Sequence, residues 1–396
     1  MNDFLLRSLL PTNVQRPTAN DILDAYHLKQ GVRNYTFNSK SEEAEVVPFR
    51  QSLFGIVSSC KLFYMKNWKY ILALLAVIVL AGCRKEVNDE PVVPTTQKFL
   101  VVTMLNSATN TFMVMSIKTD GSGGGPLVNR EFVNNNYNNI PGISADGKKL
   151  VYVSNDSIYV MTVSNGNSEF IYKNKNTVRY PVLNKNGTKI AFASIGMGQT
   201  NGSNLFVVDA VANSQAVQIT DFATDWWAGT MPAFSPDGQK IAFGVGYNAD
   251  DAIYMSNLDG SSLIRVSEEH GFGNADGYPV FSPASSKLVF SSSRYNSVYP
   301  GVFDLVLADA VAGGETTCTR LTTMSGSNAQ YPFYPAFSVD GNSIYFTAQL
   351  NNAPGSAWNI YKIPVGGGTP VNLTNATSTQ YRPFNLKEIE KTTTGS

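Results

Sequence analysis

A short phrase recurs six times along this chain of 396 residues, and the repetition constrains the fold more than any other feature. Five copies have a proline and a hydrophobic residue two positions later, and the last has Pro383 followed by Phe384. Most copies continue with a Gly-containing turn and a hydrophobic run. The prolines lie 40 to 56 residues apart, at Pro141, Pro181, Pro232, Pro279, Pro335 and Pro383, the last copy being truncated. A period in this range is typical of solenoids and propellers.

The residues within each repeat predict antiparallel strands. Asp-Gly or Asn-Gly, as in Asp237-Gly238, supplies the positive φ angles of a tight hairpin turn. The following run alternates large and small residues, as in Ile241-Ala242-Phe243, which predicts a strand with one buried face. Two further hydrophobic runs complete most repeats. Four antiparallel strands with almost no helical pattern are typical of a propeller blade.

The two ends of the repeat region complement each other. Residues 98–103 read as a second strand with no first strand before them, and Tyr381–Leu386 supplies the missing strand. Their pairing would close the ring without an exposed sheet edge. We therefore predict an all-β, six-bladed β-propeller of four-stranded antiparallel blades over residues 98–386, closed by the C-terminal strand in the first blade. Residues 387–396 are expected to be a disordered tail.

The repeat carries a family resemblance. The phrase from Ser235 to Phe243, Ser-Pro-Asp-Gly-Gln-Lys-Ile-Ala-Phe, and the later Ile-Tyr-Met at 253–255 resemble the WD-like repeats of TolB-type six-bladed propellers. The resemblance covers about residues 98–386 and implies that fold. Residues 84–97 leave no room for the small α/β domain that precedes the propeller in TolB, so we expect that domain to be absent.

A secretory signal precedes the repeats. Residues 65–69 include two lysines, residues 70–80 are apolar, and the run is short for a membrane span. Leu80-Ala-Gly-Cys83 resembles the bacterial lipobox, which implies that Cys83 becomes the lipid-modified N-terminus. The alternative is a single-pass helix. Arg84 after the cysteine implies, by resemblance to sorting rules, the outer membrane, with the propeller facing the periplasm or the cell surface.

These features divide the rest of the chain. A signal peptide lies at the translated N-terminus, so we expect translation to start at Met65 and residues 1–64 not to be made; the alternative is a short cytosolic or disordered segment. Residues 65–82 are the predicted signal peptide. Residues 83–97, rich in charge and proline, are the predicted flexible tether.

Composition argues against several functions. The 30 basic and 30 acidic residues balance, so no net charge attracts nucleic acid. His270 is the only histidine after Cys83, and no hydrolase, phosphate-loop or Cys/His metal motif is found. We therefore expect a monomeric, non-enzymatic protein without a nucleic-acid partner. Cys318 is expected to lie in a strand and to form no disulfide.

Two kinds of candidate site remain. Asp250 and Asp251 offer carboxylate oxygens to Ca²⁺, although a polar loop explains them more simply. Loops that enter the innermost strands gather at one mouth of the channel, and their aromatic and basic residues are typical of protein interfaces and sugar-stacking platforms. These residues are Arg179, Tyr180, Trp226, Trp227, His270, Tyr278, Tyr331, Tyr334 and Arg382.

The candidate binding residues are not equivalent. Tyr180, Tyr278 and Tyr334 each precede a repeat proline, so a role in packing explains them equally well. Trp226 and Trp227 do not recur and are the stronger functional candidates. The sequence thus favours a lipid-anchored scaffold that binds a cell-envelope protein. The alternative is a propeller that binds glycan or peptidoglycan fragments, or acts on carbohydrate.

Overall fold

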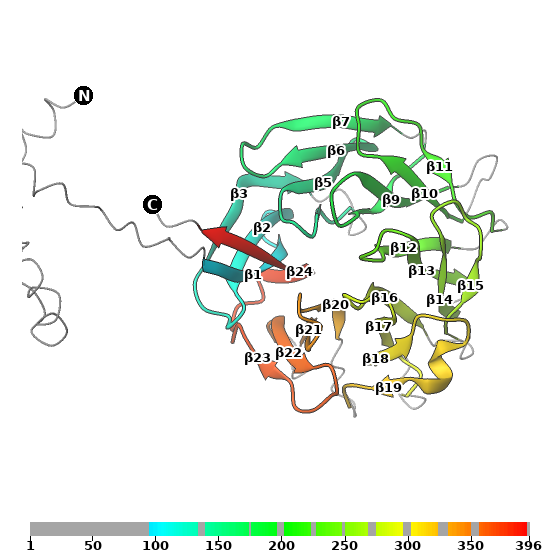
Figure 1. Cartoon of the computed structure of the whole chain (residues 1–396). Coiled ribbons are helices and arrows are strands. Elements are labelled where there is room, and N and C mark those ends of the chain that lie inside the picture. Colours follow the sequence, from blue (N-terminus) through cyan, green and yellow to red (C-terminus); the bar gives the residue numbers. More distant parts are fainter. Residues whose placement is uncertain are drawn as a thin grey trace, which may run out of the picture. The chain divides into compact units, whose positions relative to one another are not determined.

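A computed structural model describes residues 95–133, 139–173, 176–195, 202–222, 227–247, 250–267, 275–295, 302–323, 332–349 and 356–393. These residues form six four-stranded antiparallel sheets arranged as a ring of blades (Figure 1). Within the described residues the one helix is the 3₁₀ turn η1 (Gly314–Thr317). The predicted all-β, six-bladed propeller is therefore confirmed.

In each blade the chain runs outward from the innermost strand. Blade 1 contains β24 (Tyr381–Thr393), β1 (Thr95–Asn106), β2 (Thr111–Lys118) and β3 (Gly124–Val133); blade 2 contains β4 (Gly142–Ile143), β5 (Lys149–Ser154), β6 (Ser157–Thr162) and β7 (Ser168–Lys173); blade 3 contains β8 (Arg179–Leu183), β9 (Lys189–Ser194), β10 (Asn204–Asp209) and β11 (Val217–Gln218). Blade 4 contains β12 (Trp227–Phe234), β13 (Lys240–Tyr247), β14 (Asp250–Asn257) and β15 (Ile264–Arg265); blade 5 contains β16 (Asp276–Phe281), β17 (Lys287–Ser292), β18 (Asp304–Asp309) and β19 (Thr319–Arg320); blade 6 contains β20 (Phe333–Phe337), β21 (Ser343–Ala348), β22 (Asn359–Pro364) and β23 (Val371–Asn372).

The C-terminal strand closes the ring, as predicted, but it is longer than predicted. β24 pairs with β1 from Asn106↔Tyr381 to Thr95↔Thr393. The predicted limits of 98 and 386 are therefore too narrow, and residues 387–393 are strand rather than disordered tail. The physical reason is that this segment carries Ile389, which is 1% exposed and packs in the core between blades 1 and 2. The predictions for residues 1–94, including Cys83, lie outside the described residues.

The second strand of each blade is buried on both faces, whereas the alternating sequence pattern predicted burial of only one face. In β9, Ile190 and Phe192 pack in one core cluster with Val208, while Ala191 packs in another with Phe243. All of these side chains are at most 1% exposed. Each blade lies between two neighbours, so the large residues of the pattern face one neighbour and the small residues face the other.

Four of the innermost strands have a bulge at the residue before the repeat proline. Tyr180, Met231, Tyr278 and Tyr334 have φ angles of 53°, 49°, 59° and 52°. The pairing with the second strand shifts register at each of these sites. Such φ angles are costly for large residues, so the surrounding packing must hold them.

In the last repeat the bulge does not directly precede Pro383, as it would if this proline matched the other repeat prolines. In β24 the residue with positive φ is Asn385, at 40°. Phe384 pairs with Thr103 and Lys387 with Val101, so Leu386 occupies the place of the repeat proline and Pro383 lies three residues before it. The truncated copy was therefore aligned wrongly from the sequence.

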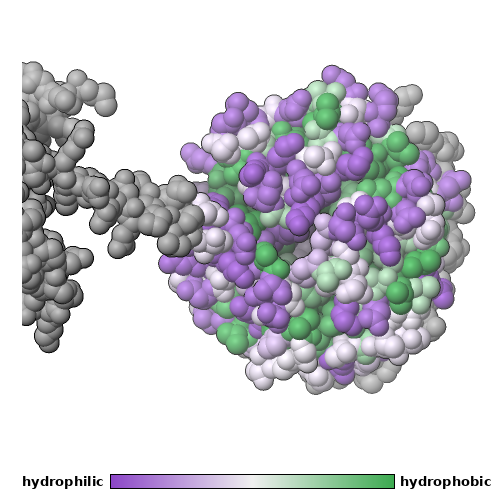
Figure 2. All heavy atoms as spheres, viewed as in Figure 1, coloured by the Kyte–Doolittle hydropathy of each residue, from purple (hydrophilic) through white to green (hydrophobic). Residues whose placement is uncertain are grey.

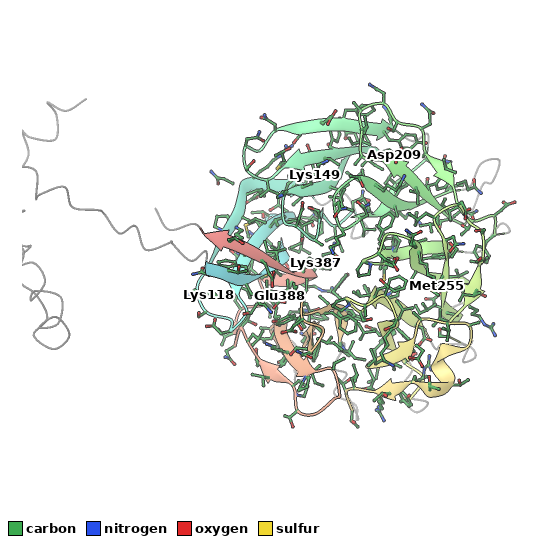
Figure 3. All side chains as sticks on the ribbon, in the orientation of Figure 1. Lys118, Lys149, Asp209, Met255, Lys387 and Glu388 are labelled. Carbon is green, nitrogen blue, oxygen red and sulfur yellow. The ribbon has the colours of Figure 1, made fainter. Side chains whose placement is uncertain are left out.

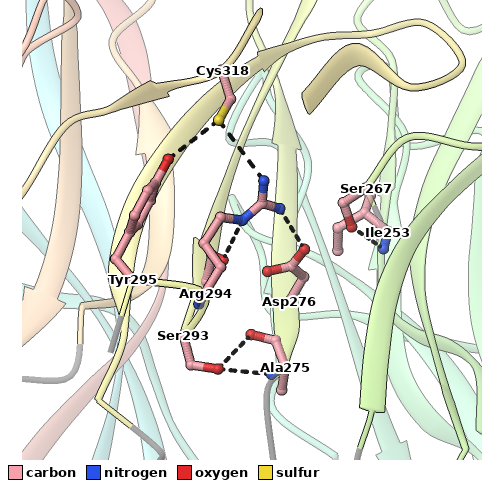
Figure 4. A network of polar contacts seen from close by, with 9 residues as sticks. Ile253, Ser267, Ala275, Asp276, Ser293, Arg294, Tyr295 and Cys318 are labelled. Atoms are coloured by element: carbon pink, nitrogen blue, oxygen red, sulfur yellow. Dashed lines mark hydrogen bonds and ion pairs between the residues drawn. The ribbon is translucent and has the colours of Figure 1, made fainter. Parts of the chain in front are cut away.

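Buried polar contacts join the strands of blade 5 (Figure 4). Arg294 forms an ion pair of 2.7 Å with the fully buried carboxylate of Asp276 and donates to the Ser292 hydroxyl at 2.9 Å. The Cys318 thiol lies 3.3 Å from the Tyr295 hydroxyl. Cys318 is a free cysteine, as predicted, but it precedes β19 rather than lying in a strand.

Candidate binding site in the central channel

A cavity of about 670 Å³ occupies the channel, and residues of all six innermost strands line it. The lining begins at the bulges and ends at the hairpin turns that follow these strands, with Asp146, Lys148 and Lys185 near its mouth. Polar side chains surround the hollow at the centre of the ring in Figure 2. The cavity is therefore apolar along the strands and charged at one end of the ring.

The strand register arranges most of the lining in three layers. The five bulge residues and Ile140, which precedes the repeat proline of blade 2, form the tyrosine layer, composed of Ile140, Tyr180, Met231, Tyr278, Tyr334 and Asn385. Two residues further along the strands lies the Lys387 layer, composed of Gly142, Val182, Ala233, Val280, Ala336 and Lys387. The next residues form the junction layer, composed of Ile143, Leu183, Phe234, Phe281, Phe337 and Glu388.

The tyrosine layer is held together by ring contacts. Tyr278 and Tyr334 meet edge to face, with their ring centroids 4.5 Å apart. Tyr334 also contacts Phe384 at 5.0 Å. Burial raises the pKa of Tyr180 to about 12, and the neighbouring Tyr278 adds to this effect. Burial likewise raises the pKa values of Tyr278 and Tyr334, so all three phenols are neutral at physiological pH.

These pKa values predict a loss of stability in alkali. The folded state raises the pKa of Tyr180 from 10 to about 12, so the stabilisation is complete below pH 10 and is lost as the pH rises toward 12. Thermal melts followed by circular dichroism across this range should show a falling melting temperature. The Tyr278→Phe variant should lose less over the same range. Equal losses in the variant and the wild type would contradict this role for the tyrosine layer.

Lys387 is the only ionisable residue in its layer, and Figure 3 shows it on β24 beside the centre of the ring. The side chain is half-buried. Burial lowers the pKa of its ammonium group, and the nearby charge of Lys185 lowers it further. Within the described part of the chain, no hydrogen bond or ion pair engages this ammonium group.

On the other side of the tyrosine layer, arginine and aromatic residues meet. The Arg382 guanidinium lies 4.3 Å from the ring centroid of Trp358 and 5.0 Å from that of Phe384. Its Nε atom is buried and has no hydrogen-bond partner among the described residues. A cleft of about 300 Å³ lies beside it, lined in part by Trp358 and Tyr381. This end of the ring therefore presents Trp, Tyr and Arg side chains together.

The structure brings some of the predicted binding residues together. Tyr180, Tyr278 and Tyr334 lie in the channel rather than in surface loops, and Arg382 lies next to them. Arg179 begins β8 and Trp227 begins β12, but the side chain of Trp227 is not among those described. Trp226, His270 and Tyr331 lie outside the described residues, so their binding role stays a prediction.

The calcium prediction also stays open. Asp251 lies in β14 opposite Gly246, while the side chain of Asp250 is not among those described. No group of three His, Cys, Asp or Glu residues is placed to bind a metal in the described ranges. The same ranges contain no helix that is long and apolar enough to cross a bilayer.

Two residues were missed from the sequence. Trp358 stands outside the repeated phrase, and only its position over Arg382 marks it. Lys387 stands out among small residues once the bulge gives the register of β24. The available signal was its place within the last repeat, which the position of Pro383 obscured.

Known proteins resemble the chain over part of its length. No protein-family model matches it. The TolB homologue of Chlorobium luteolum is 26% identical over 166 residues, which are 41% of this chain and 35% of the relative. The Tol-Pal system protein TolB of Francisella tularensis is 26% identical over 202 residues, which are 50% of this chain and 41% of the relative. The chain thus spans less than half the length of these curated relatives.

Solved structures share the fold. TolB from Acinetobacter baumannii has a TM-score of 0.55 at 18% identity, with 74% of this chain and 66% of that chain covered. The hydrazine synthase of Kuenenia stuttgartiensis has a TM-score of 0.53 at 15% identity, with 75% and 47% covered. Since a synthase shares the fold, the fold alone does not separate binding proteins from enzymes. The repeats and the closure by β24 thus show a six-bladed β-propeller, and part of the chain is similar in sequence to TolB proteins.

Proposed function

We propose that this chain is a non-enzymatic protein-binding module of the cell envelope. The observation that carries the proposal is the group of Trp358, Tyr381 and Arg382 beside a cleft of about 300 Å³. Tryptophan, tyrosine and arginine are the residues most enriched in interface hot spots. The TolB names of the curated relatives, one of them a Tol-Pal system protein, support a place in the envelope.

The partner surface extends to the loops at the same end of the ring. The innermost strands of a propeller all run in one direction, so the residues that open β12 and β24 lie at one end. Trp227 begins β12 and Trp226 precedes it in the sequence, so both are included in the proposed surface with Trp358 and Arg382. Arg382 favours a partner that offers an acidic or carbonyl group above the Trp358 ring.

A capture experiment tests this function. Detergent-solubilised envelopes are passed over wild-type protein, the Trp358→Ala variant and the Trp226→Ala/Trp227→Ala variant, and bound proteins are identified by mass spectrometry. Loss of a hot-spot tryptophan costs about 2 kcal/mol or more, so recovery of the partner should fall by roughly thirtyfold.

The control is Phe170→Ala, because Phe170 is 36% exposed on the outer strand β7 and lies outside the proposed surface. This variant should retain the partner. Capture of the same proteins by all variants would refute the proposed surface. Capture of no protein by the wild type would refute the protein-binding role, and glycan arrays would then test the alternative ligand class.

The anchor is part of the proposal. A lipid on Cys83, at the end of the Leu-Ala-Gly-Cys motif, would hold the propeller at the outer membrane, since each buried CH₂ contributes about 0.8 kcal/mol. In the same envelope preparations, labelled palmitate should be incorporated into the wild type and not into Cys83→Ser. Absence of label in the wild type would exclude the lipid anchor without affecting the capture result.

A further inference from the structure

The repeats themselves show that Lys387 is not required by the fold. Five of the six positions in its layer carry glycine, alanine or valine, and each pairs with the second strand in the same way. Lys387 pairs equivalently with Val101. The fold is therefore compatible with a small apolar residue at this position. The charge that Lys387 places in the channel is not needed for strand pairing.

No acidic side chain of the described cavity lining is paired with the Lys387 ammonium group. Both oxygens of Glu388 accept hydrogen bonds, from the Val339 N–H and from the Tyr345 hydroxyl. Asp146 accepts hydrogen bonds from its own turn, at 2.6 Å from the Ser144 hydroxyl and 3.0 Å from the Lys148 N–H. Glu390, the remaining acid in the lining, is exposed to solvent.

A second lysine in the cavity lining acts on the charge of Lys387. Lys185 disfavours its protonated form, and burial disfavours it more strongly. An ammonium group in such a place costs stability unless an anion joins it. Lys387 and the exposed Lys185 thus line one cavity, and no acidic side chain of its described lining pairs with either ammonium group.

The volume of the cavity and the tyrosine layer that lines one end of it indicate what kind of anion fits. Its volume of about 670 Å³ is in the range of small-molecule sites. The tyrosine layer lies two residues from Lys387 along the strands, roughly 7 Å away. A carboxylate at Lys387 would therefore bring an attached ring or short chain against Tyr278 and Tyr334.

We propose that the channel binds a small organic carboxylate, with the carboxylate between Lys387 and Lys185 and the apolar part against the tyrosine layer. This site is separate from the partner surface around Trp358. The two proposals therefore stand or fall independently.

Benzoate is a suitable probe because it joins a carboxylate to a flat ring, and benzyl alcohol is its neutral counterpart. Carbon NMR of lysine labelled at Cε should show saturable shifts of the Lys387 signal with benzoate, at a dissociation constant of about 10 mM or tighter. Benzyl alcohol should bind at least about tenfold more weakly. Benzoate should also move the titration midpoint of Lys387 to higher pH, because an anion favours the ammonium form.

The Lys387→Met variant should bind benzoate at least about tenfold more weakly while it binds benzyl alcohol as the wild type does. Methionine suits the apolar layer, and Lys387→Ala, which matches Ala336, is a second variant that keeps the fold. The control is Lys189→Met, because Lys189 forms an exposed ion pair with Asp209 and does not line the cavity. It should leave benzoate binding unchanged.

Three results would each overturn the proposal. They are the absence of saturable benzoate binding, equal affinity for benzoate and benzyl alcohol, and unchanged benzoate affinity in both Lys387 variants. Inorganic phosphate is titrated in parallel to separate charge from shape. Phosphate binding equal to that of benzoate would contradict the part of the proposal that concerns the tyrosine layer.

Discussion

Truncation of the chain after Gln380 is expected to prevent formation of a folded propeller. The truncation removes β24, which pairs with β1 along most of its length. It also removes Phe384, which is 1% exposed and lies 5.8 Å from Phe112 and 5.0 Å from Tyr334 between ring centroids. β1 would become an open edge at the channel, a site for aggregation.

The magnitude follows from burial. Phe384, Leu386 and Ile389 are all buried, and each such side chain contributes about 1.5–3 kcal/mol when it leaves water. Their sum is comparable with the whole stability of a typical domain, about 5–15 kcal/mol. The truncated chain should therefore show no cooperative thermal transition and should be digested rapidly by protease.

A graded series separates the strand from the tail. Truncation after Thr393 leaves β24 whole and should change the melting temperature little. Truncation after Leu386 removes Glu388 and Ile389 and should lower the stability by several kcal/mol, about 3 or more. A truncation after Leu386 that melts like the full-length protein would contradict the structure and favour the sequence-based prediction of a disordered tail.

The sequence was sufficient to predict the fold because the repeats report local chemistry. The Asp-Gly and Asn-Gly turns and the hydrophobic runs each specify a hairpin, and their number and spacing specify the ring. Closure by β24 was also accessible, because a missing first strand and an unpaired C-terminal strand must meet. These features depend on residues close together in the sequence.

The candidate sites were less accessible because they depend on register and on contacts between distant blades. Tyr180, Tyr278 and Tyr334 were expected at a channel mouth, but the bulge at each one turns it into the channel. Lys387 was assigned to a disordered tail, since Pro383 suggested a register three residues away from the true one. The position of Trp358 over Arg382 joins blades 6 and 1 and leaves no local signature.

The junctions between blades show the same dependence on register. At five junctions, a second-strand residue and a junction-layer residue of the next blade belong to one apolar cluster: Val101 with Ile143, Val151 with Leu183, Ala191 with Phe234, Ala242 with Phe281, and Val289 with Phe337. At the sixth, where β24 closes the ring, the pair is Tyr345 and Glu388, joined by a hydrogen bond of 2.8 Å. The closing junction thus replaces an apolar pair with a polar one.

Replacement of either member of this pair alone is expected to be strongly destabilising. Glu388→Phe places a large ring against Tyr345 and leaves the Tyr345 hydroxyl and the Val339 N–H without their acceptor, at a cost of about 3 kcal/mol or more. Tyr345→Ala opens a cavity beside a carboxylate that is buried and has lost a donor, at a similar cost of about 3–5 kcal/mol.

The double variant Tyr345→Ala/Glu388→Phe gives the closing junction the same alanine–phenylalanine pair that Ala242 and Phe281 form between blades 4 and 5. It should be more stable than the sum of the two single changes predicts, by about 1.5–3 kcal/mol. Denaturant unfolding of the wild type, the two single variants and the double variant measures this coupling.

Adding Val339→Pro should stabilise the double variant further, because proline has no N–H to leave unpaired. Proline is compatible with this turn position, since Pro236 occupies the equivalent position beside the junction of Ala242 and Phe281. The control cycle combines Tyr345→Ala with Thr392→Ala, an exposed change in β24, and should show no coupling. Additive effects of Tyr345→Ala and Glu388→Phe would show that the hydrogen bond does not specify how the last blade meets the first.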